Sequence, residues 1–328
     1  MYVIGIDAGA SKTYCLAARV DGTITGFGQA LAGSYEVAGI EKAKENILAS
    51  VEESLAQSGA SPDEVEFGCF ALAGADFYPE DFDMLTTAMQ ELGVCRKVLV
   101  KNDAIAGLRA GITRPYGVVV IMGSGFNGAG IGKDGTEIRY FAEGFIFGDV
   151  GGGGQIGRES LYHAFRGWDG RGKPTSLAKR ALEHFEAKDM EQLARILYYN
   201  RESWKKIFGL CPVVFEEACE GDEVACEIIR KMGEEAGVSA NAIIRRLGLE
   251  HDEFEVVLAG SVFKGKGPLM LDVVKSVVHG VAPRAQVITP RYEPVVGALI
   301  LALEAAGIPF EGPASDNLDR TVPQELRR

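Results

Sequence analysis

The sequence predicts an α/β fold in which two halves of the chain begin with the same β-rich unit. The first unit is a strand at Tyr2–Ile6, a turn of small residues at Asp7–Thr13, a second strand at Tyr14–Val20 and an Asp-Gly turn. A similar unit follows after residue 117, and the triplet Asp-Gly-Thr occurs in both. Internal similarity of this kind indicates two related domains.

The second unit begins with the apolar strand Val118–Met122, followed by a glycine-rich turn and the triplet Asp-Gly-Thr at 134–136. Residues 123–128 match the dinucleotide-binding fingerprint G-x-G-x-x-G, which needs a helix directly after it. Here Ala129–Gly132 leads into the Asp-Gly turn and predicts a β-hairpin instead. The residues therefore argue against a nicotinamide cofactor.

Composition favours small-molecule chemistry. The 328 residues are 47% hydrophobic and carry a formal net charge of −12, which disfavours nucleic acid and anionic membranes as partners. The six cysteines lack metal-ligand spacing, and no apolar run is long enough to span a membrane. No signal peptide precedes the first strand, so we expect a cytoplasmic protein.

The first small-residue turn contains the donors that a phosphate needs. Ser11, Lys12 and Thr13 would add two hydroxyls and an ammonium to the backbone N–H groups of the turn. Asp7 could then anchor Mg²⁺, directly or through water. The turn joins two strands and is no P-loop, whose motif is absent. An ordinary polar hairpin is the alternative interpretation.

The first half continues with helices and strands in alternation. We expect a loop at 33–36, a helix at Gly39–Gln57, a strand at Val65–Leu72 ending in a loop at 73–76, a helix at Glu80–Leu92, a strand at Val98–Val100 and a short helix at Ala104–Ala110.

Asp103 lies between that last strand and the short helix, and it has two interpretations. A carboxylate at the start of a helix often caps it. Strand ends in α/β sheets also open onto the ligand site, where an ionised Asp103 could accept a proton from a substrate hydroxyl.

The second half adds a glycine run and a long helical block. Glycines 151–154 would let the backbone approach a ligand closely while Asp149 binds its hydroxyls, or they are only a flexible entry to a helix. The remaining expected elements are helix Arg158–Arg166, a helical block at 176–248 with its longest helix at Asp222–Leu247, strand Phe254–Leu258, helix 268–280, strand Gln286–Ile288 and helix Pro294–Ala306. The tail from Pro309 lacks periodicity, and we expect it to be poorly ordered.

Four segments occur in the order of known motifs. IGIDAGASKT, VKNDAIAGL, VVVIMGSGFNG and VVLAGSVF resemble the phosphate-1, connect, phosphate-2 and adenosine motifs of the sugar kinase/Hsp70/actin superfamily. Over about residues 2–307 the chain is most similar to the BadF/BadG/BcrA/BcrD group, which includes N-acetylglucosamine kinases. The resemblance implies two ribonuclease-H-like domains of the actin-like ATPase fold, with ATP and Mg²⁺ in the cleft between them and a helical insertion in the second domain.

The resemblance also implies roles for individual residues. Asp103 matches the catalytic base, and Asp7 would hold the metal. The residues expected to bind ATP and its phosphates are Gly9, Ala10, Ser11, Lys12, Thr13, Gly123, Ser124, Gly125, Gly260 and Ser261. The residues expected to bind the acceptor are Ser34, Tyr35, Glu36, Gly74, Asp76, Asn102 and Asp149.

The chain departs from the sugar kinases only in the expected sugar pocket. Phe126 replaces a usual Ser, Ser34 stands where several have Asn, and Val150-Gly151-Gly152 replaces a frequent Glu-Gly-Ser. The resemblance implies transfer of the ATP γ-phosphoryl group to a hydroxyl of an amino sugar or hexose, in the first place an N-acetylglucosamine-like one, by a homodimer.

Two other functions occur among relatives of this group. An ATPase activator of a 2-hydroxyacyl-CoA dehydratase or benzoyl-CoA reductase holds an iron–sulfur cluster through cysteines after the phosphate-2 region, and no cysteine lies between 95 and 211. A sugar-sensing regulator would add a helix-turn-helix, for which we expect no room before the first strand.

The expected domains are 1–113 and 114–293, with a helical insertion at 176–248, a closing helix at 294–307 and a tail at 308–328.

Overall fold

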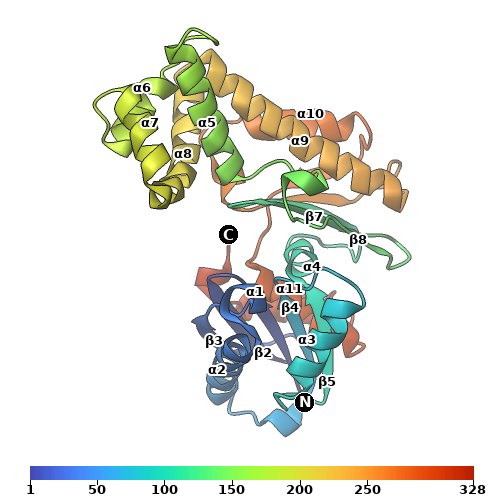
Figure 1. Cartoon of the computed structure of the whole chain (residues 1–328). Coiled ribbons are helices and arrows are strands. Elements are labelled where there is room, and N and C mark those ends of the chain that lie inside the picture. Colours follow the sequence, from blue (N-terminus) through green and yellow to red (C-terminus); the bar gives the residue numbers. More distant parts are fainter. The chain divides into compact units, whose positions relative to one another are not determined.

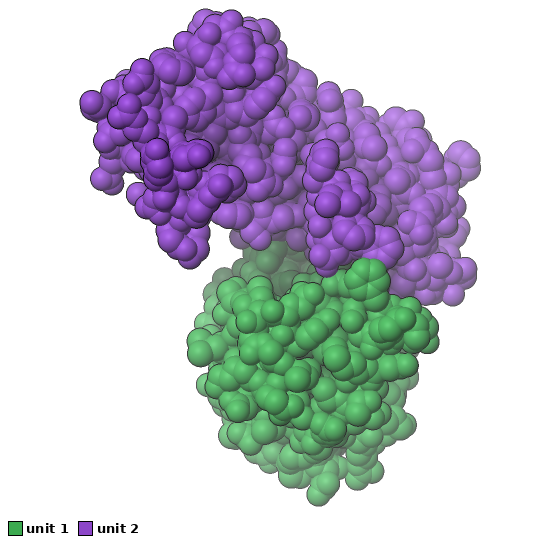
Figure 2. Space-filling view, viewed as in Figure 1, with its two compact units in different colours: residues 1–117, 288–328 green, residues 118–287 purple.

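The computed structural model describes residues 1–328, which form two compact units (Figures 1 and 2). Unit 1 comprises Met1–Gly117 and Ile288–Arg328, and unit 2 comprises Val118–Val287. Each unit is described by itself. The expected domain limits and the expected nucleotide cleft stay predictions.

The sheet of unit 1 has five strands in the order β3-β2-β1-β4-β5. Its strands are β1 (Tyr2–Ala8), β2 (Lys12–Arg19), β3 (Ile24–Leu31), β4 (Val65–Leu72) and β5 (Lys97–Asn102). The first three strands pair antiparallel, whereas β1, β4 and β5 run parallel. Their carboxyl ends therefore meet at one edge of the sheet.

The sheet of unit 2 repeats this topology in the order β10-β9-β6-β7-β8. Its strands are β6 (Gly117–Met122), β7 (Phe126–Ile131), β8 (Glu137–Arg139), β9 (Glu255–Ala259) and β10 (Gln286–Ile288). Strand β7 begins directly after the glycine turn, so the predicted hairpin is confirmed. Two α/β domains of ribonuclease-H-like strand order are confirmed as well.

The two Asp-Gly turns are the same structure. In each, the aspartate side chain accepts from the backbone N–H two residues later, Asp21 from Thr23 at 3.0 Å and Asp134 from Thr136 at 2.9 Å. These bonds to the carboxylates lower the pKa of both aspartates. The glycines that follow have φ values of 85° and 82°. The duplication predicted from the sequence thus extends to single hydrogen bonds.

The helices of unit 1 cover both faces of its sheet. They are α1 (Tyr35–Ala38), α2 (Ile40–Ser58), α3 (Glu80–Gln90), α4 (Asp103–Arg109), α11 (Pro294–Ala305) and α12 (Pro313–Thr321). Ile4 and Ile6 join the core formed with α2 and α3, while Gly5 points the other way, as alternation along a strand requires. A Cβ at Gly5 would lie 2.2 Å from the backbone nitrogen of Leu299, so α11 packs directly on β1.

The helices of unit 2 lie mostly between β8 and β9. They are α5 (Gly153–Trp168), α6 (Leu177–Phe185), α7 (Met190–Tyr199), α8 (Leu210–Cys219), α9 (Glu223–Leu247) and, after β9, α10 (Leu269–His279). Helix α9 crosses the sheet at β7 and β8 and packs along α10 (Figure 1). No helix of the chain has both the length and the apolar composition that a membrane crossing requires.

Four local expectations were wrong. The expected loop at 33–36 is only partly a loop, because helix α1 begins at Tyr35. The first hairpin turn is shorter than 7–13, because Asp7 and Thr13 lie on paired strands. Helix α5 begins at Gly153, so two of the four glycines are helical. The tail is not irregular: α12 buries Leu318, and Thr321 accepts a hydrogen bond from the backbone N–H of Ile24 at 2.9 Å.

Candidate functional site

The carboxyl ends of three parallel strands form a row at one edge of the unit 1 sheet. Ala8 of β1 lies opposite Leu72 of β4, and Leu72 lies opposite Asn102 of β5. The segments that leave these strands therefore begin side by side. Among them are the predicted acceptor loop at 74–76 and the predicted base, Asp103.

Asn102 connects these segments. Its side-chain oxygen accepts from the backbone N–H of Ala104 at 3.0 Å and so caps α4. Its amide nitrogen donates to the carboxylate of Asp76 at 2.9 Å. The capping role that Asp103 might have had therefore belongs to Asn102, and Asp103 is the first residue of the helix.

Asp7 and Asp103 are close enough to influence each other. Asp7 lies on β1 one residue before the end of the strand, and it is partly buried. Removal from water, followed by the charge of Asp103, raises the pKa of Asp7 to about 7. Two carboxylates at this edge therefore repel each other, which is the situation that a bound cation relieves.

The first hairpin turn is tied to the predicted acceptor loop. The carbonyl of Gly9 accepts from the backbone N–H groups of Gly33 at 3.0 Å and Ser34 at 3.2 Å. Ala10 and Ser11 are exposed at the tip, whereas Ser34 is buried. The predicted phosphate and acceptor loops of unit 1 thus form one connected structure.

Two side chains of this hairpin are already engaged. The hydroxyl of Thr13 is directed into the sheet and donates to the carbonyl of Leu31 at 2.8 Å. The Lys12 ammonium lies 4.0 Å from the ring centre of Tyr14 and donates to its hydroxyl. The Thr13 hydroxyl, which was expected to donate to phosphate, is therefore used inside the sheet.

The predicted acceptor loops of unit 1 are held by a residue that the sequence did not single out. One oxygen of Asp81 accepts from the hydroxyl of Tyr35 at 3.3 Å, and the other accepts from the backbone N–H groups of Asp76 and Phe77. Burial, followed by the charges of Asp81 and Glu36, raises the pKa of Tyr35 to about 12. Gly74 lies under this ring, where a Cβ would be 2.7 Å from a ring carbon.

Unit 2 contains a pocket of about 570 Å³. The second glycine turn contributes Gly123 and Ser124 to its lining, and the loop after β9 contributes Ser261. The predicted phosphate-2 and adenosine residues therefore converge on one cavity. Gly125 completes the turn, because its carbonyl accepts from the N–H of Gly123 at 3.0 Å.

Glycines allow the surrounding segments to approach this turn. Gly260 has a φ of 99°, and a Cβ there would lie 2.3 Å from the carbonyl oxygen of Met122. Gly152 has a φ of 84°, and its Cβ would lie 2.5 Å from the carbonyl oxygen of Gly125. The glycine run predicted to approach a ligand thus packs against the turn, and the first turn of α5 donates to its carbonyls.

The far wall of the pocket was missed by sequence reasoning. It consists of Phe208, Cys211, Pro212, Phe215 and Glu216. Four of these residues are apolar, so this wall suits the flat face of a nucleobase. Burial raises the pKa of the Cys211 thiol to about 11, which leaves it protonated. The only signal was a short apolar run, which an ordinary core helix also shows.

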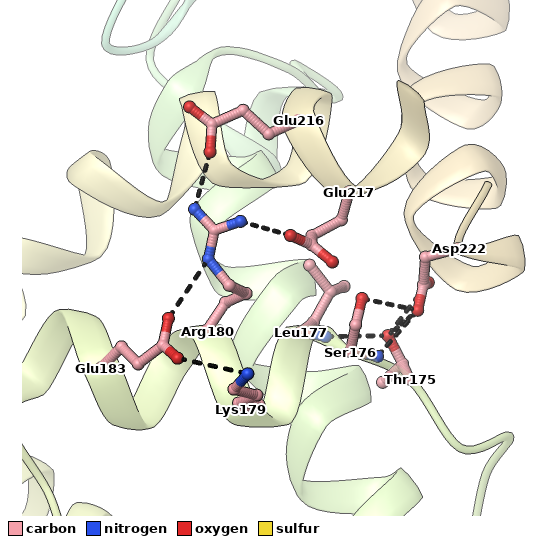
Figure 3. A network of polar contacts seen from close by, with 9 residues as sticks. All are labelled: Thr175, Ser176, Leu177, Lys179, Arg180, Glu183, Glu216, Glu217 and Asp222. Atoms are coloured by element: carbon pink, nitrogen blue, oxygen red, sulfur yellow. Dashed lines mark hydrogen bonds and ion pairs between the residues drawn. The ribbon is translucent and has the colours of Figure 1, made fainter. Parts of the chain in front are cut away.

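A polar network fixes α8, which carries most of this wall (Figure 3). Arg180 of α6 donates to Glu216 at 2.6 Å and also bonds Glu217 on the same helix. Asp222 accepts from the hydroxyls of Thr175 and Ser176, just before α6, and also caps α9. Helices α6, α8 and α9 are therefore tied together beside the pocket.

Asp149 closes a loop of unit 2. Its carboxylate accepts from the backbone N–H of Gly144 at 3.1 Å, and its own N–H donates to the carbonyl of Gly144 at 3.2 Å. The loop between them contains the 3₁₀ turn Phe145–Phe147. Asp149 thus has a structural contact in addition to its predicted role toward the acceptor.

Comparison with known proteins identifies the family. The model of the BadF/BadG/BcrA/BcrD ATPase family matches residues 4–302. The chain belongs to this family. The four motifs and the repeated strand order of both units are therefore those of a BadF-type ATPase.

Two curated BadF-type relatives are named as kinases. The chain is 29% identical over 303 residues to the N-acetylmuramic acid/N-acetylglucosamine kinase of Clostridium acetobutylicum, covering 92% of this chain and 98% of that protein. It is 28% identical over 312 residues to the N-acetyl-D-glucosamine kinase of Dictyostelium discoideum, with the same coverage.

Solved structures show the same fold at lower identity. A proposed N-acetylglucosamine kinase from Chromobacterium violaceum has a TM-score of 0.64 at 22% identity, covering 92% of this chain and 98% of that one. A glucokinase from Streptomyces griseus, solved with glucose and AMPPNP, has a TM-score of 0.55 at 18% identity, covering 93% and 100%. These likenesses establish the actin-like sugar kinase fold for this BadF-type ATPase.

Proposed function

We propose that this protein is an ATP-dependent sugar kinase that phosphorylates an N-acetylglucosamine-like acceptor. The observation that carries the proposal is the division of roles between Asn102 and Asp103. Because Asn102 caps α4, Asp103 places a carboxylate at the carboxyl edge of the sheet without being the cap of this helix. The kinase names of two relatives with nearly full coverage support the same function.

Asp103 would act as the general base. Phosphoryl transfer is mostly a matter of positioning and charge stabilisation, so the protein needs one acceptor for the proton of the attacking hydroxyl. Asn102 and Asp76, bonded to each other, would bind sugar hydroxyls beside it. Ser34, Tyr35, Glu36 and Gly74 would complete the acceptor loops of unit 1, and Asp149 would contribute from unit 2.

The residues at this edge fit Mg²⁺. Asp7 is a partly buried carboxylate whose pKa is raised by desolvation and by the neighbouring charge of Asp103. Oxygen ligands suit Mg²⁺, and a cation would favour the ionised form of Asp7. Asp7 would hold the ion directly or through water. When bound, Mg²⁺ would neutralise charge on the phosphates.

The nucleotide would use the glycine turns of both units. Gly9, Ala10, Ser11 and Lys12 would meet its phosphates on unit 1, while the buried Thr13 would support the hairpin through its bond to Leu31. On unit 2, Gly123, Ser124 and Gly125 would do the same, while Gly260 and Ser261 would lie by the adenosine. The apolar wall of the unit 2 pocket supports this placement, because a purine needs a flat apolar surface. A cytoplasmic location and a homodimer stay predictions.

The function is tested by ADP release over a panel of amino sugars and hexoses. We expect N-acetylglucosamine to stimulate release in the wild type. Asp103→Asn should lower the turnover number by about 10²–10⁴, the range for loss of a general base, while the dissociation constant of ATP changes little. Unchanged turnover would remove Asp103 from the mechanism. ADP release that no sugar stimulates, from a protein containing iron, would favour the dehydratase-activator alternative.

A further inference from the structure

A second hollow of unit 2 lies between α5 and α9 and has a volume of about 360 Å³. We call it the α5–α9 pocket. Its lining residues are Gln155, Arg158, Glu159, Tyr162 and Lys231. None of them lines the pocket described above, and none is a predicted site residue. The α5–α9 pocket therefore has no part in the proposed phosphoryl transfer.

Four of the five lining side chains share one face of α5. Gln155 and Glu159 are four residues apart, as are Arg158 and Tyr162, so the two pairs form neighbouring rows on the helix. Lys231 completes the pocket from α9, which packs against α5. The pocket thus belongs to two helices of one unit and needs no other segment.

The carboxylate of Glu159 is fixed in position. Its side chain is only 15% exposed, and one oxygen accepts from the amide of Gln155 at 3.0 Å and from the ammonium of Lys231 at 2.9 Å. The other oxygen lies 3.7 Å from Nε2 of His163. This second oxygen keeps lone pairs with which it can accept from a hydroxyl of a ligand.

Two other groups of the pocket are hardly used within the chain. The guanidinium of Arg158 makes a single hydrogen bond, to the amide oxygen of Gln155 at 3.3 Å, and has no carboxylate partner. By contrast, Arg171 and Arg180 of the same unit each pair with a carboxylate. The hydroxyl of Tyr162 makes no hydrogen bond, and this residue is 55% exposed. An ordinary polar helix face would explain the bonded pair Gln155 and Glu159, but not an unpaired guanidinium beside an open ring.

We propose that the α5–α9 pocket binds a sugar phosphate. Arg158 and Lys231 would donate to the phosphate, because hydrogen bonds between such cations and a phosphate are strong. The sugar would lie on the ring of Tyr162, and Glu159 would accept from its hydroxyls. This inference rests on the proposed function, since a sugar phosphate is the product of that reaction.

The size and charge of the pocket favour this class of ligand. Its volume lies at the lower end of the range for pockets that hold small molecules, and it exceeds what a phosphate ion alone would fill. Two cations and one carboxylate line it, and the guanidinium of Arg166 lies 5.2 Å from the ring centre of Tyr162. A neutral sugar would leave the guanidinium of Arg158 without a counter-charge.

The test is calorimetric titration of the whole protein with N-acetylglucosamine 6-phosphate and with the 1-phosphate. Saturating N-acetylglucosamine is present, so that the predicted acceptor site is occupied and the remaining binding reports the α5–α9 pocket. We expect the wild type to bind one equivalent of at least one of the two sugar phosphates. Arg158→Gln should weaken this binding by about tenfold or more, the effect of losing a hydrogen bond to a charged group, and leave kcat for sugar phosphorylation unchanged.

Tyr162→Leu tests the sugar part of the ligand separately. Loss of the ring should weaken binding of the sugar phosphate by about threefold to tenfold, whereas binding of inorganic phosphate should stay unchanged. Inorganic phosphate that binds the wild type as tightly as the sugar phosphate does would overturn this assignment of the ligand.

Arg195→Gln is the matched control, because Arg195 is an exposed arginine of α7 outside the α5–α9 pocket. Equal binding by the wild type and Arg158→Gln would overturn the inference, as would an equal loss in Arg195→Gln. A wild type that phosphorylates no sugar, yet binds sugar phosphate in a manner that depends on Arg158, would overturn the proposed function alone. Phosphorylation of a sugar without such binding would refute this inference alone.

Discussion

At the carboxyl edge of the first sheet, neighbouring residues divide tasks that either could perform. Asparagine and aspartate are equally good helix caps, so two of them in succession do not show which one caps. The fold decides this, because the amide of Asn102 can donate to Asp76 while its oxygen caps α4. A second carboxylate at position 102 would instead face Asp76 with like charge.

Asp7 provides a prediction about pH. Its pKa rises from 3.8 to about 7 on folding, so between these values the folded state binds more protons than the unfolded state. The contribution of Asp7 to the free energy of unfolding should therefore fall as pH rises from about 4 to about 7, and stay constant above that. Urea unfolding of the wild type and of Asp7→Asn over this pH range measures this contribution as the difference between their free energies of unfolding. A difference that is constant, or that grows with pH, would contradict the assignment.

For single site residues, the sequence predicted which residue types are present but not which contacts they make. Asp7, Asn102 and Asp103 were identified from motifs, and the structure places them at the carboxyl ends of β1 and β5, which both pair with β4. Thr13 was expected to donate to phosphate, but its hydroxyl bonds Leu31. Asp81 was not singled out, because one aspartate in a polar helix start has no distinguishing pattern.

Among the elements, α8 matters most for the unit 2 pocket. It supplies Cys211, Pro212, Phe215 and Glu216 to the lining, and its position depends on α6 through Arg180. Two acidic residues in succession on α8 share this one guanidinium (Figure 3). Removal of the guanidinium would leave both carboxylates without this counter-charge.

Arg180→Met should therefore affect the nucleotide and not the acceptor. If ATP occupies the pocket, we expect the KM of ATP to rise by about threefold to tenfold, the effect of about 1 kcal/mol, and the KM of the sugar to stay unchanged. Lys173→Met is the control, because Lys173 pairs with Glu223 and Glu227 on α9, and none of the three lines the pocket. Equal changes in both KM values would show a general loss of structure.

Element prediction was good where periodicity was strong. The strand Val65–Leu72 has the predicted limits, and the helix predicted at 222–247 begins one residue later because Asp222 is its cap. Helix α5 was placed late, because glycine has a low helix propensity and its first turn is stabilised by contacts with the glycine turn instead. The pocket wall could not be found from periodicity, since a lining residue and a core residue look alike.

On the scale of the whole molecule, the last segment of the chain returns to the first. Helix α11 packs on β1 and α4, and a Cβ at Gly297 would lie 1.9 Å from the carbonyl oxygen of Ala106. Asn317 of α12 donates to the carbonyl of Asp21 at 2.8 Å. Helix α12 was not predicted because Ala314 and Leu318 are its only buried residues, and it depends on contacts with distant segments.

The tail should therefore contribute to the stability of unit 1. Leu318 is fully buried, and Leu318→Ala should lower the free energy of unfolding of this unit by about 2–4 kcal/mol, as for other buried leucines. Asp316→Ala, at an exposed position of the same helix, is the control. Thermal or urea unfolding measures both variants. Equal stabilities of Leu318→Ala and the wild type would show that α12 is not part of the folded unit.

The packing of α11 on β1 also affects the order in which the protein folds during synthesis. The ribosome completes every strand of unit 2, the last of which ends at Ile288, before it makes α11. Although unit 1 is synthesised first, one face of β1 stays uncovered until α11 has been made. We expect the middle of the nascent protein to become protease-resistant before its beginning, which limited proteolysis of arrested translation products would reveal.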